Sequence, residues 1–193
     1  MKDRKIILAS GSPRRIEMMQ SHGYAPIICP AKVEENLPVI GGMKETAMFL
    51  ALKKAKHVEK NGEFDDGSII IAADTIVYKD EVMGKPLDSD DCFRMLDALK
   101  NDVHYVVTGV AMVVVGAQKT HVFADVTKVF FKDYSDEELR DYLAGNEWKD
   151  KAGGYAIQGH FARYVDKIEG DYDNVVGFPW YRIESELKKL QEE

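Results

Sequence analysis

The residues that most constrain the fold are 5–16, because they read as a short strand that runs directly into a helix. The apolar run 6–8 suits a buried strand. Ser12 and Pro13 are a strong helix start, since serine is a preferred N-cap and proline fits the first helical position. The chain therefore begins with a strand and a helix joined by a very short turn.

That turn, Ser10-Gly11, has the features of a phosphate-binding site. Glycine lets the backbone approach a ligand closely, and the amides of the first helical turn point outward at the positive end of the helix dipole. Arg14 and Arg15 follow on the first turn, and a guanidinium can bind phosphate oxygens through two parallel hydrogen bonds. An ordinary capped helix with solvated arginines is the alternative at this point.

Composition limits the class of protein. A chain of 193 residues with 45% hydrophobic residues predicts one globular domain or two small lobes. The formal net charge of -7 argues against a nucleic-acid polymer as the main partner, but not against a small anion in a locally basic pocket. The two cysteines, Cys29 and Cys92, lie far apart and indicate a reducing compartment. No stretch approaches the roughly 20 apolar residues of a membrane span, and the charged start lacks a signal-peptide core, so we expect a cytoplasmic protein without membrane contact.

A carboxylate follows the most apolar stretch of the chain. Residues 68–75 predict a strand covered on both faces that ends at Asp74. Ligands of open α/β sheets bind beyond the carboxyl ends of the strands, so Asp74 is well placed to hold a metal ion or a water. A hairpin of residues 76–78 and 82–83 is expected to bring Lys85 back near Asp74. An aspartate that only caps a turn is the alternative.

Two further features concern charged residues. Residues 43–60 predict a long helix whose apolar face includes Lys54, and a lysine there must either extend to the edge of the face or meet an anion. Glu34 and Glu35 are adjacent carboxylates in an expected loop. Such pairs are usually solvated, and their meaning depends on what lies opposite.

The remaining elements are predicted from capping and periodicity. In order they are a helix from Asp88 with its apolar face at Cys92 to Leu99, an antiparallel hairpin of 103–115 and 121–131, a helix from the capping box at Ser135 to Gly145, a glycine-rich segment 149–159, a strand 161–168, a loop 169–174, and a closing helix from Pro179.

Several separated motifs together resemble the Maf family of nucleoside triphosphate pyrophosphatases. They are LASGSPRR at 8–15, ADT at 73–75 with GKP at 84–86, DKAG leading to YAIQG at 150–159, and VGFP at 176–179. The motifs occur in the family's order over essentially the whole chain, which makes a chance match very improbable. The resemblance implies an α/β fold similar to that of inosine triphosphate pyrophosphatases. In that fold a mixed twisted sheet with flanking helices forms two lobes around a central cleft, here as a single domain over 1–193.

The resemblance also implies a reaction. A nucleoside triphosphate is hydrolysed between its α and β phosphates, giving a monophosphate and pyrophosphate, with a divalent metal such as Mg²⁺ or Mn²⁺. Asp74 would be the catalytic acid/base and a metal ligand, and Glu35 a second metal-associated carboxylate. The residues that would bind phosphate are Ser10, Arg15, Lys54 and Lys85.

Three positions bear on the base that is recognised. Arg14, Thr75 and Gln158 match positions at which subfamilies differ, and their combination resembles the subgroup that acts on dTTP and UTP. The chain departs from the usual family pattern at Gly154, Ala156 and His160, all in or next to the same glycine-rich segment. The geometry of that segment is therefore the least directly transferred part of the resemblance.

Simple electrostatics agrees with this interpretation. A triphosphate carries about four negative charges, which Arg14, Arg15, Lys54 and Lys85 would match on an otherwise acidic protein. A different class of function is a nucleotide-binding regulator of septum formation and cell division with little turnover, and a pyrophosphate-release assay separates the two. The sequence leaves open whether the chain forms a homodimer.

Overall fold

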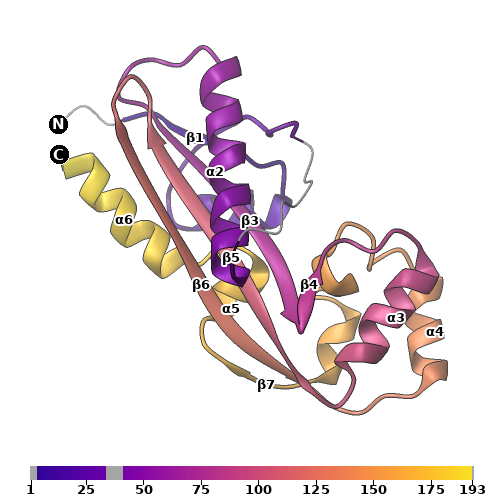
Figure 1. Ribbon diagram of the computed structural model, residues 1–193. Helices are drawn as coiled ribbons and strands as arrows, with labels where there is room; N and C mark the ends of the chain where they lie inside the picture. Colours follow the sequence, from indigo (N-terminus) through magenta and orange to yellow (C-terminus); the bar gives the residue numbers. More distant parts are fainter. Residues whose placement is uncertain (1–3, 34–40, 193) are drawn as a thin grey trace.

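The computed structural model describes residues 4–33 and 41–192 (Figure 1). Its strands are β1 (Ile6–Leu8), β2 (Ile27–Ile28), β3 (Ile69–Lys79), β4 (Glu81–Met83), β5 (Val103–Val114), β6 (Lys119–Phe131) and β7 (Val165–Glu169). Its α-helices are α1 (Pro13–Ser21), α2 (Met43–Asn61), α3 (Ser89–Leu99), α4 (Asp136–Ala144), α5 (Tyr172–Val176) and α6 (Trp180–Glu192). Two short 3₁₀-helices, η1 (Ala152–Gly154) and η2 (His160–Tyr164), lie between α4 and β7.

The strands form one mixed sheet in the order β2-β1-β3-β5-β6-β7, with β4 paired to the end of β3. Strand β1 runs parallel to both β2 and β3, and the remaining pairs are antiparallel. The long hairpin of β5 and β6 runs the length of the molecule. This arrangement confirms the mixed sheet with flanking helices that the sequence predicted.

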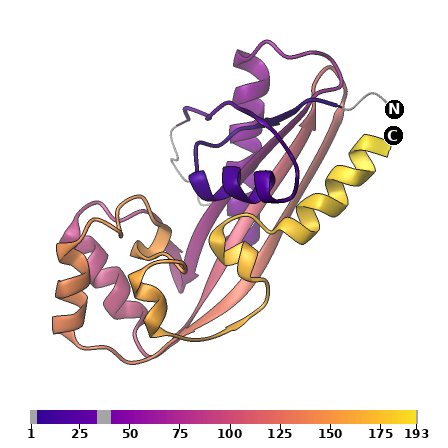
Figure 2. The ribbon, with the colours of Figure 1, turned by 180° about the vertical axis from the view of Figure 1, so that it is seen from behind.

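Successive side chains of β3 point to opposite faces of the sheet, and each face is covered by different helices. Ile69, Ile71 and Ala73 pack in a core with α1 and α6. Ile70 and Ala72 point to the opposite face, where they pack against α2. Figures 1 and 2 show α2 on one side of the sheet and α1 with α6 on the other.

A second core lies at the other end of the long hairpin and makes the distal lobe. It contains apolar residues of α3 and α4, aromatic residues of η2, and the far ends of β5 and β6. In Figure 1 this lobe stands apart from the layers around α2 and α6, so the molecule is elongated with a lobe at each end. The two lobes of the prediction are therefore present.

Most of the predicted elements are confirmed, with boundaries within a few residues. The helix predicted over 43–60 is α2, the hairpin is β5 with β6, and the capping box of Ser135 with Glu138 opens α4. No helix in the described part of the chain combines the length and the apolar character needed to span a membrane.

Three boundary predictions are wrong. The strand predicted over 68–75 continues to Lys79, since its whole second half pairs with β5, so Asp74 lies inside a strand and not at its end. The strand predicted over 161–168 begins only at Val165, because Phe161 and Tyr164 form one face of η2 that packs into the aromatic core of the distal lobe. The loop predicted over 169–174 contains the start of α5, which Asp171 caps by accepting a hydrogen bond from Asp173 N–H.

Candidate active site

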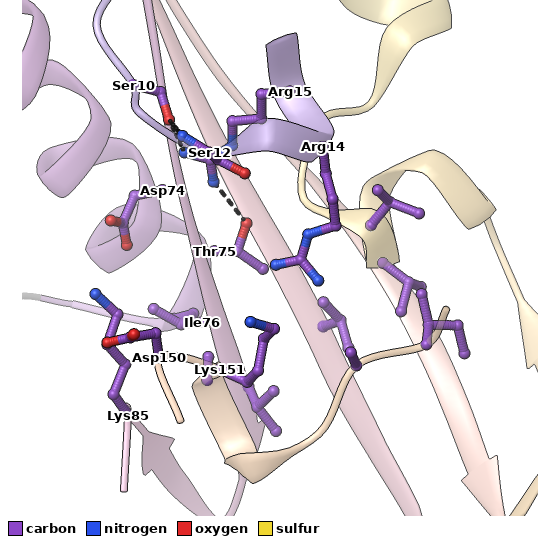
Figure 3. Close-up of a pocket in the computed structure, with 18 of the residues that line it drawn as sticks. Ser10, Ser12, Arg14, Arg15, Asp74, Thr75, Ile76, Lys85, Asp150 and Lys151 are labelled. Carbon is purple, nitrogen blue, oxygen red and sulfur yellow. Dashed lines mark hydrogen bonds between the residues drawn. The ribbon is translucent and has the colours of Figure 1, made fainter. Parts of the chain in front are cut away.

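A gap along one edge of β3 creates the candidate site. Strand β1 covers this edge only as far as Ile71, and β4 begins to cover it at Val77. Between them lies a cavity of about 820 Å³ lined by residues of both lobes (Figure 3). Asp74 is thus inside β3 but just beyond the carboxyl end of β1. Ligands of open α/β sheets bind beyond such strand ends, so a ligand is still expected beside Asp74.

The cavity is strongly basic on an acidic protein. Its charged lining side chains are Arg14, Arg15, Lys54, Lys85, Lys151, Asp74 and Asp150, five cations and two carboxylates. All the cations predicted to bind phosphate are therefore in one place. Such an excess of positive charge in a concave site favours a polyanionic ligand.

Asp74 and Lys54 form a buried ion pair at the floor of the cavity. Asp74 is 7% exposed and accepts a hydrogen bond from the Lys54 ammonium. The pair forms because Asp74 shares a face of β3 with Ile70 and Ala72, which is the face that α2 covers. The lysine in the apolar stripe of α2 meets an anion, as one of the two sequence alternatives predicted.

Gly109 allows α2 to come close enough for this pair. It is the partner of Asp74 across β3 and β5, and a Cβ there would lie 2.2 Å from the backbone carbonyl of Ala47. Ala47, Ala51 and Ala55 continue the close contact along the buried side of α2. Small residues on both elements therefore determine how near Lys54 lies to the sheet.

The start of α1 forms another wall of the cavity. Ser12 is the N-cap residue and Pro13 the first helical residue, but the Ser12 side chain makes no capping hydrogen bond. The buried Ser10 hydroxyl accepts hydrogen bonds from the Ser12 amide and from Arg15, both at 3.2 Å, so its own proton is what it can offer a ligand. Arg14 turns into the cavity, where burial lowers the pKa of its guanidinium (Figure 3).

Arg15 holds the walls of the cavity together. Its guanidinium donates to the carbonyls of Gly177 at 2.9 Å and Ala73 at 2.7 Å, to Ser10, and to the Thr75 hydroxyl at 3.2 Å. At least four of its five N–H donors therefore contact protein groups. The role of Arg15 as a phosphate ligand stays a prediction, and its hydrogen bonds link α1 to β3 and to the end of α5.

Thr75 continues this network into the sheet. Its hydroxyl lies 3.0 Å from that of Thr108, which donates to the carbonyl of the fully buried Asn174. The Asn174 side chain in turn bonds the backbone of β5. Gly177 is needed beside this network, since a Cβ there would lie 2.9 Å from the Thr75 hydroxyl and its φ is +104°.

Sequence reasoning assigned no role to two residues that line the cavity, Asp150 and Lys151. Figure 3 shows both side chains directed into the cavity, with Asp150 beside Lys85. Asp150 has a φ of 61°, a conformation that non-glycine residues seldom adopt and that is common at functional sites. Their position directly before the glycine-rich turn was the feature of the sequence that could have indicated a role at the cavity.

One predicted site residue, Gln158, does not line the cavity. Its side chain is exposed, and its role in base recognition stays a prediction. Glu35 lies outside the described residues.

Comparison with known proteins identifies the family. The model of the family described as Maf-like protein matches residues 5–190. The chain belongs to the Maf family. A dTTP/UTP pyrophosphatase of Alkaliphilus oremlandii is 41% identical over 180 residues, covering 93% of each chain. One from Bacillus cereus (strain B4264) is 41% identical over 188 residues, covering 97% of this chain and 96% of the relative. One from Lachnoclostridium phytofermentans is 39% identical over 194 residues, covering 96% and 95%.

The fold comparison agrees with the expected class. The Ham1 protein of Staphylococcus aureus superposes with a TM-score of 0.51 at 12% identity, over 96% of this chain and 99% of that one. The likeness confirms the inosine triphosphate pyrophosphatase type of fold for this Maf protein.

The cavity of this Maf protein has a donor set that fits a divalent cation. Mg²⁺ prefers oxygen ligands and is usually held by one or two carboxylates together with substrate phosphates. Asp74 and Asp150 line the cavity from the two lobes, although the described residues contain no cluster of three or more metal-binding side chains. This set suits a metal that arrives with a phosphate ligand.

Proposed function

We propose that this Maf protein hydrolyses dTTP and UTP between the α and β phosphates, giving the nucleoside monophosphate and pyrophosphate. One observation carries the proposal: a buried carboxylate, Asp74, faces a cavity that five cations line. The names of relatives about 40% identical over nearly the full length support the same chemistry. We place the reaction in the cytoplasm, where nucleoside triphosphates are made.

Asp74 has the role of the catalytic acid/base. Its carboxylate, held by Lys54, can orient a water for attack on the α phosphorus and accept its proton. Negative charge then develops on the phosphoryl oxygens and on the leaving pyrophosphate. Fixed cations stabilise that charge, so no covalent intermediate with the protein is required.

The other residues divide into three groups, which bind phosphate, hold the site together and bind the metal. Ser10, Arg14 and Lys85 bind phosphate oxygens from the walls of the cavity, with Lys54 at its floor. Arg15 acts mainly by holding Ser10 and Thr75 in place. Asp74 and Asp150, with Glu35 as predicted from the family, would hold Mg²⁺ or Mn²⁺. When bound, the metal neutralises phosphate charge.

Base selection is assigned to Arg14, Thr75 and Gln158, as predicted from the sequence. A uracil or thymine edge presents a ring N–H beside a carbonyl, which a side-chain amide such as that of Gln158 can match. A site built to pair a substrate group rejects analogues that leave its polar atoms unmatched, by factors that can reach ~10⁴. The Gln158→Ala variant should therefore narrow the preference for pyrimidines.

A substrate panel tests the function. With Mg²⁺ present, pyrophosphate release should show a kcat/KM for dTTP and UTP well above that for ATP and GTP. Asp74→Asn should lower turnover at least ~100-fold, as expected for loss of a positioned acid/base, with the fold retained. GTP or 7-methyl-GTP as the best substrate would contradict the assigned specificity. Nucleotide binding without turnover would favour the regulator.

A further inference from the structure

Most of the charged lining side chains gather at one end of the cavity, together with the apolar Leu50, Ile76 and Val82, and the other end is mainly apolar. Asp74 and Lys54 lie on the α2 face of the sheet. Thr75 points to the other face, as do the paired residues Val77 and Val106 further along β3 and β5. The apolar end is completed by Tyr155, Ala156, Ile157, Val175 and Val176. In Figure 3 the side chains made only of carbon gather mainly beyond Arg14 and Lys151 as seen from Asp74.

A single segment of chain runs from one end of the cavity to the other. It begins at Asp150, whose side chain lies beside Lys85 at the charged end (Figure 3). It ends with Tyr155, Ala156 and Ile157, which line the apolar end. Figure 3 shows the Lys151 ammonium between Asp150 and the Arg14 guanidinium, at the boundary between the two ends. On the opposite wall the same boundary is occupied by Arg14.

A nucleoside triphosphate has the same polarity as this cavity. Its polyphosphate fits the charged end and its base fits the apolar end, which leaves the α-phosphoryl group at the boundary. We propose that Lys151 binds the oxygens of the α-phosphoryl group, opposite Arg14, and is thereby a catalytic residue at the reacting phosphorus. This inference rests on the proposed function, because it takes a nucleoside triphosphate as the ligand.

The backbone around Lys151 is held by hydrogen bonds to neighbouring segments. The amide of Gly153 donates to the carbonyl of Gly84 at 3.0 Å, which links the segment to the residue before Lys85. Gly153 and Gly154 have φ values of 67° and 78°, and side chains there would collide with Val77 and Cys92. A lysine on such a segment loses little further backbone freedom when it binds a ligand.

Lys151 has a single weak hydrogen bond among the described residues. Its ammonium donates to the carbonyl of Lys149 at 3.5 Å. Burial lowers its pKa first, and the nearby charges of Arg14 and Lys85 lower it further, against opposing effects of Asp150 and Glu147. Three cations that converge on one space favour the binding of an anion there.

A lysine at the α-phosphoryl group should affect the binding of only one of the two products, the nucleoside monophosphate and pyrophosphate. A residue on the α-phosphoryl group keeps its contact with the nucleoside monophosphate and has no contact with pyrophosphate. A residue at the charged end, such as Lys85, does the reverse. Binding of the two products to the same variant therefore locates Lys151 along the substrate without any turnover.

The test compares Lys151→Gln with Lys149→Gln by calorimetry and kinetics. Lys149 is a matched control, since it is two residues away, exposed, beside the Trp148 ring and not part of the cavity lining. Lys151→Gln should weaken UMP binding at least about tenfold, the effect of losing one charge-assisted hydrogen bond, with pyrophosphate binding within about twofold of wild type. It should also lower kcat for UTP, Lys151→Arg should restore part of both losses, and Lys149→Gln should resemble wild type.

Several results would overturn this assignment. Weaker binding of pyrophosphate with unchanged binding of UMP would place Lys151 at the leaving group. Equal weakening of UMP and pyrophosphate binding would mean that Lys151 acts only through the overall charge of the cavity. Unchanged binding of both products would mean that Lys151 does not contact the ligand. Failure of the proposed function gives a different result, since wild-type protein would then release no pyrophosphate from any nucleotide in the panel.

Discussion

Lys54 shows how a single side chain connects the fold to the reaction. It lies on the buried side of α2, and its ammonium meets the carboxylate of Asp74, which is itself buried. Removing one partner of a buried ion pair leaves the other without its charge compensation, which is costly. The same residue therefore contributes to the stability of the free protein and to the orientation of the carboxylate that we propose as the acid/base.

We predict that Lys54→Met lowers the free energy of unfolding by about 2 kcal/mol, the scale of a hydrogen bond to a charged group. The comparison is Lys85→Met, which removes an exposed cation of the same cavity and should change stability by less than about 0.5 kcal/mol. Both variants should lose activity. Urea denaturation of the two variants gives the measurement, and an unchanged midpoint for Lys54→Met would show that the pair does not stabilise the fold.

Residue types at the site could be predicted from the sequence more readily than their geometry. The strand–turn–helix start identified Ser10 and Arg14, and the apolar stripe of α2 indicated that Lys54 needs an anion. The role of Arg15 could not be predicted, because its partners Ala73, Thr75 and Gly177 lie about 60 to 160 positions away in the chain. Only the tertiary structure brings these acceptors to one guanidinium.

At the scale of elements, the packing of α2 on the sheet determines the geometry of the site. Gly109 and the alanines of α2 allow the backbones of α2 and β5 to come into contact. Gly109 is the cross-strand partner of Asp74, so this contact lies next to the carboxylate. The distance between α2 and β3 therefore decides whether Lys54 reaches the carboxylate.

Gly109→Ala should separate α2 from the sheet and weaken the Lys54–Asp74 contact. A Cβ at this position would lie 2.2 Å from backbone atoms, which side-chain rotation cannot relieve. We expect a loss of stability of about 1–3 kcal/mol, typical of overpacking in a core, together with a lower kcat. Gly84→Ala is the stability control, since a Cβ there meets nothing within 4 Å. Thermal unfolding of both variants tests the prediction, which is contradicted if they behave alike.

Helices and strands were predictable wherever a local signal was strong. The capped helices α3 and α4 and the hairpin of β5 and β6 have such signals. Strand β3 was predicted too short because Asp74 resembles a strand end, whereas pairing with β5 along its whole length outweighs that preference. Helix α5 was missed because a one-turn helix with a single cap differs little in sequence from a loop.

At the scale of the whole molecule, the two lobes are joined by strands that run through both. Strands β5 and β6 pair continuously from Val103 to Val114, and residues of both strands enter both cores. We keep the prediction of a single domain for this reason. The cleft between the lobes then depends on the packing of the distal core as well as on the helices around β1.

His104 is the most unusual residue of that distal core. It is fully buried, and its Nε2 lies 2.6 Å from the hydroxyl of Tyr155, a residue that lines the cavity. Its Nδ1 is buried without a hydrogen-bond partner among the described residues. Burial, with a smaller contribution from the charge of Lys79, lowers the pKa of His104 to about 3.

This pKa makes the stability of the whole fold depend on pH. An unfolded histidine has a pKa near 6.5, so between pH 6.5 and pH 3 the unfolded chain binds a proton at this position that the folded chain does not. The contribution of His104 to the free energy of unfolding is therefore fully present above about pH 6.5. It decreases as the pH falls, and about 2 kcal/mol is lost at pH 5. In His104→Gln, which can still bond Tyr155, the difference in unfolding free energy between pH 7.5 and pH 5 should be smaller by that amount. His57→Gln, at a half-buried position of α2 outside the distal core, is the comparison for replacing one histidine. An equal decline in wild type, His104→Gln and His57→Gln would mean that His104 is protonated in the folded state, and that the distal core admits a charge next to the wall of the cavity.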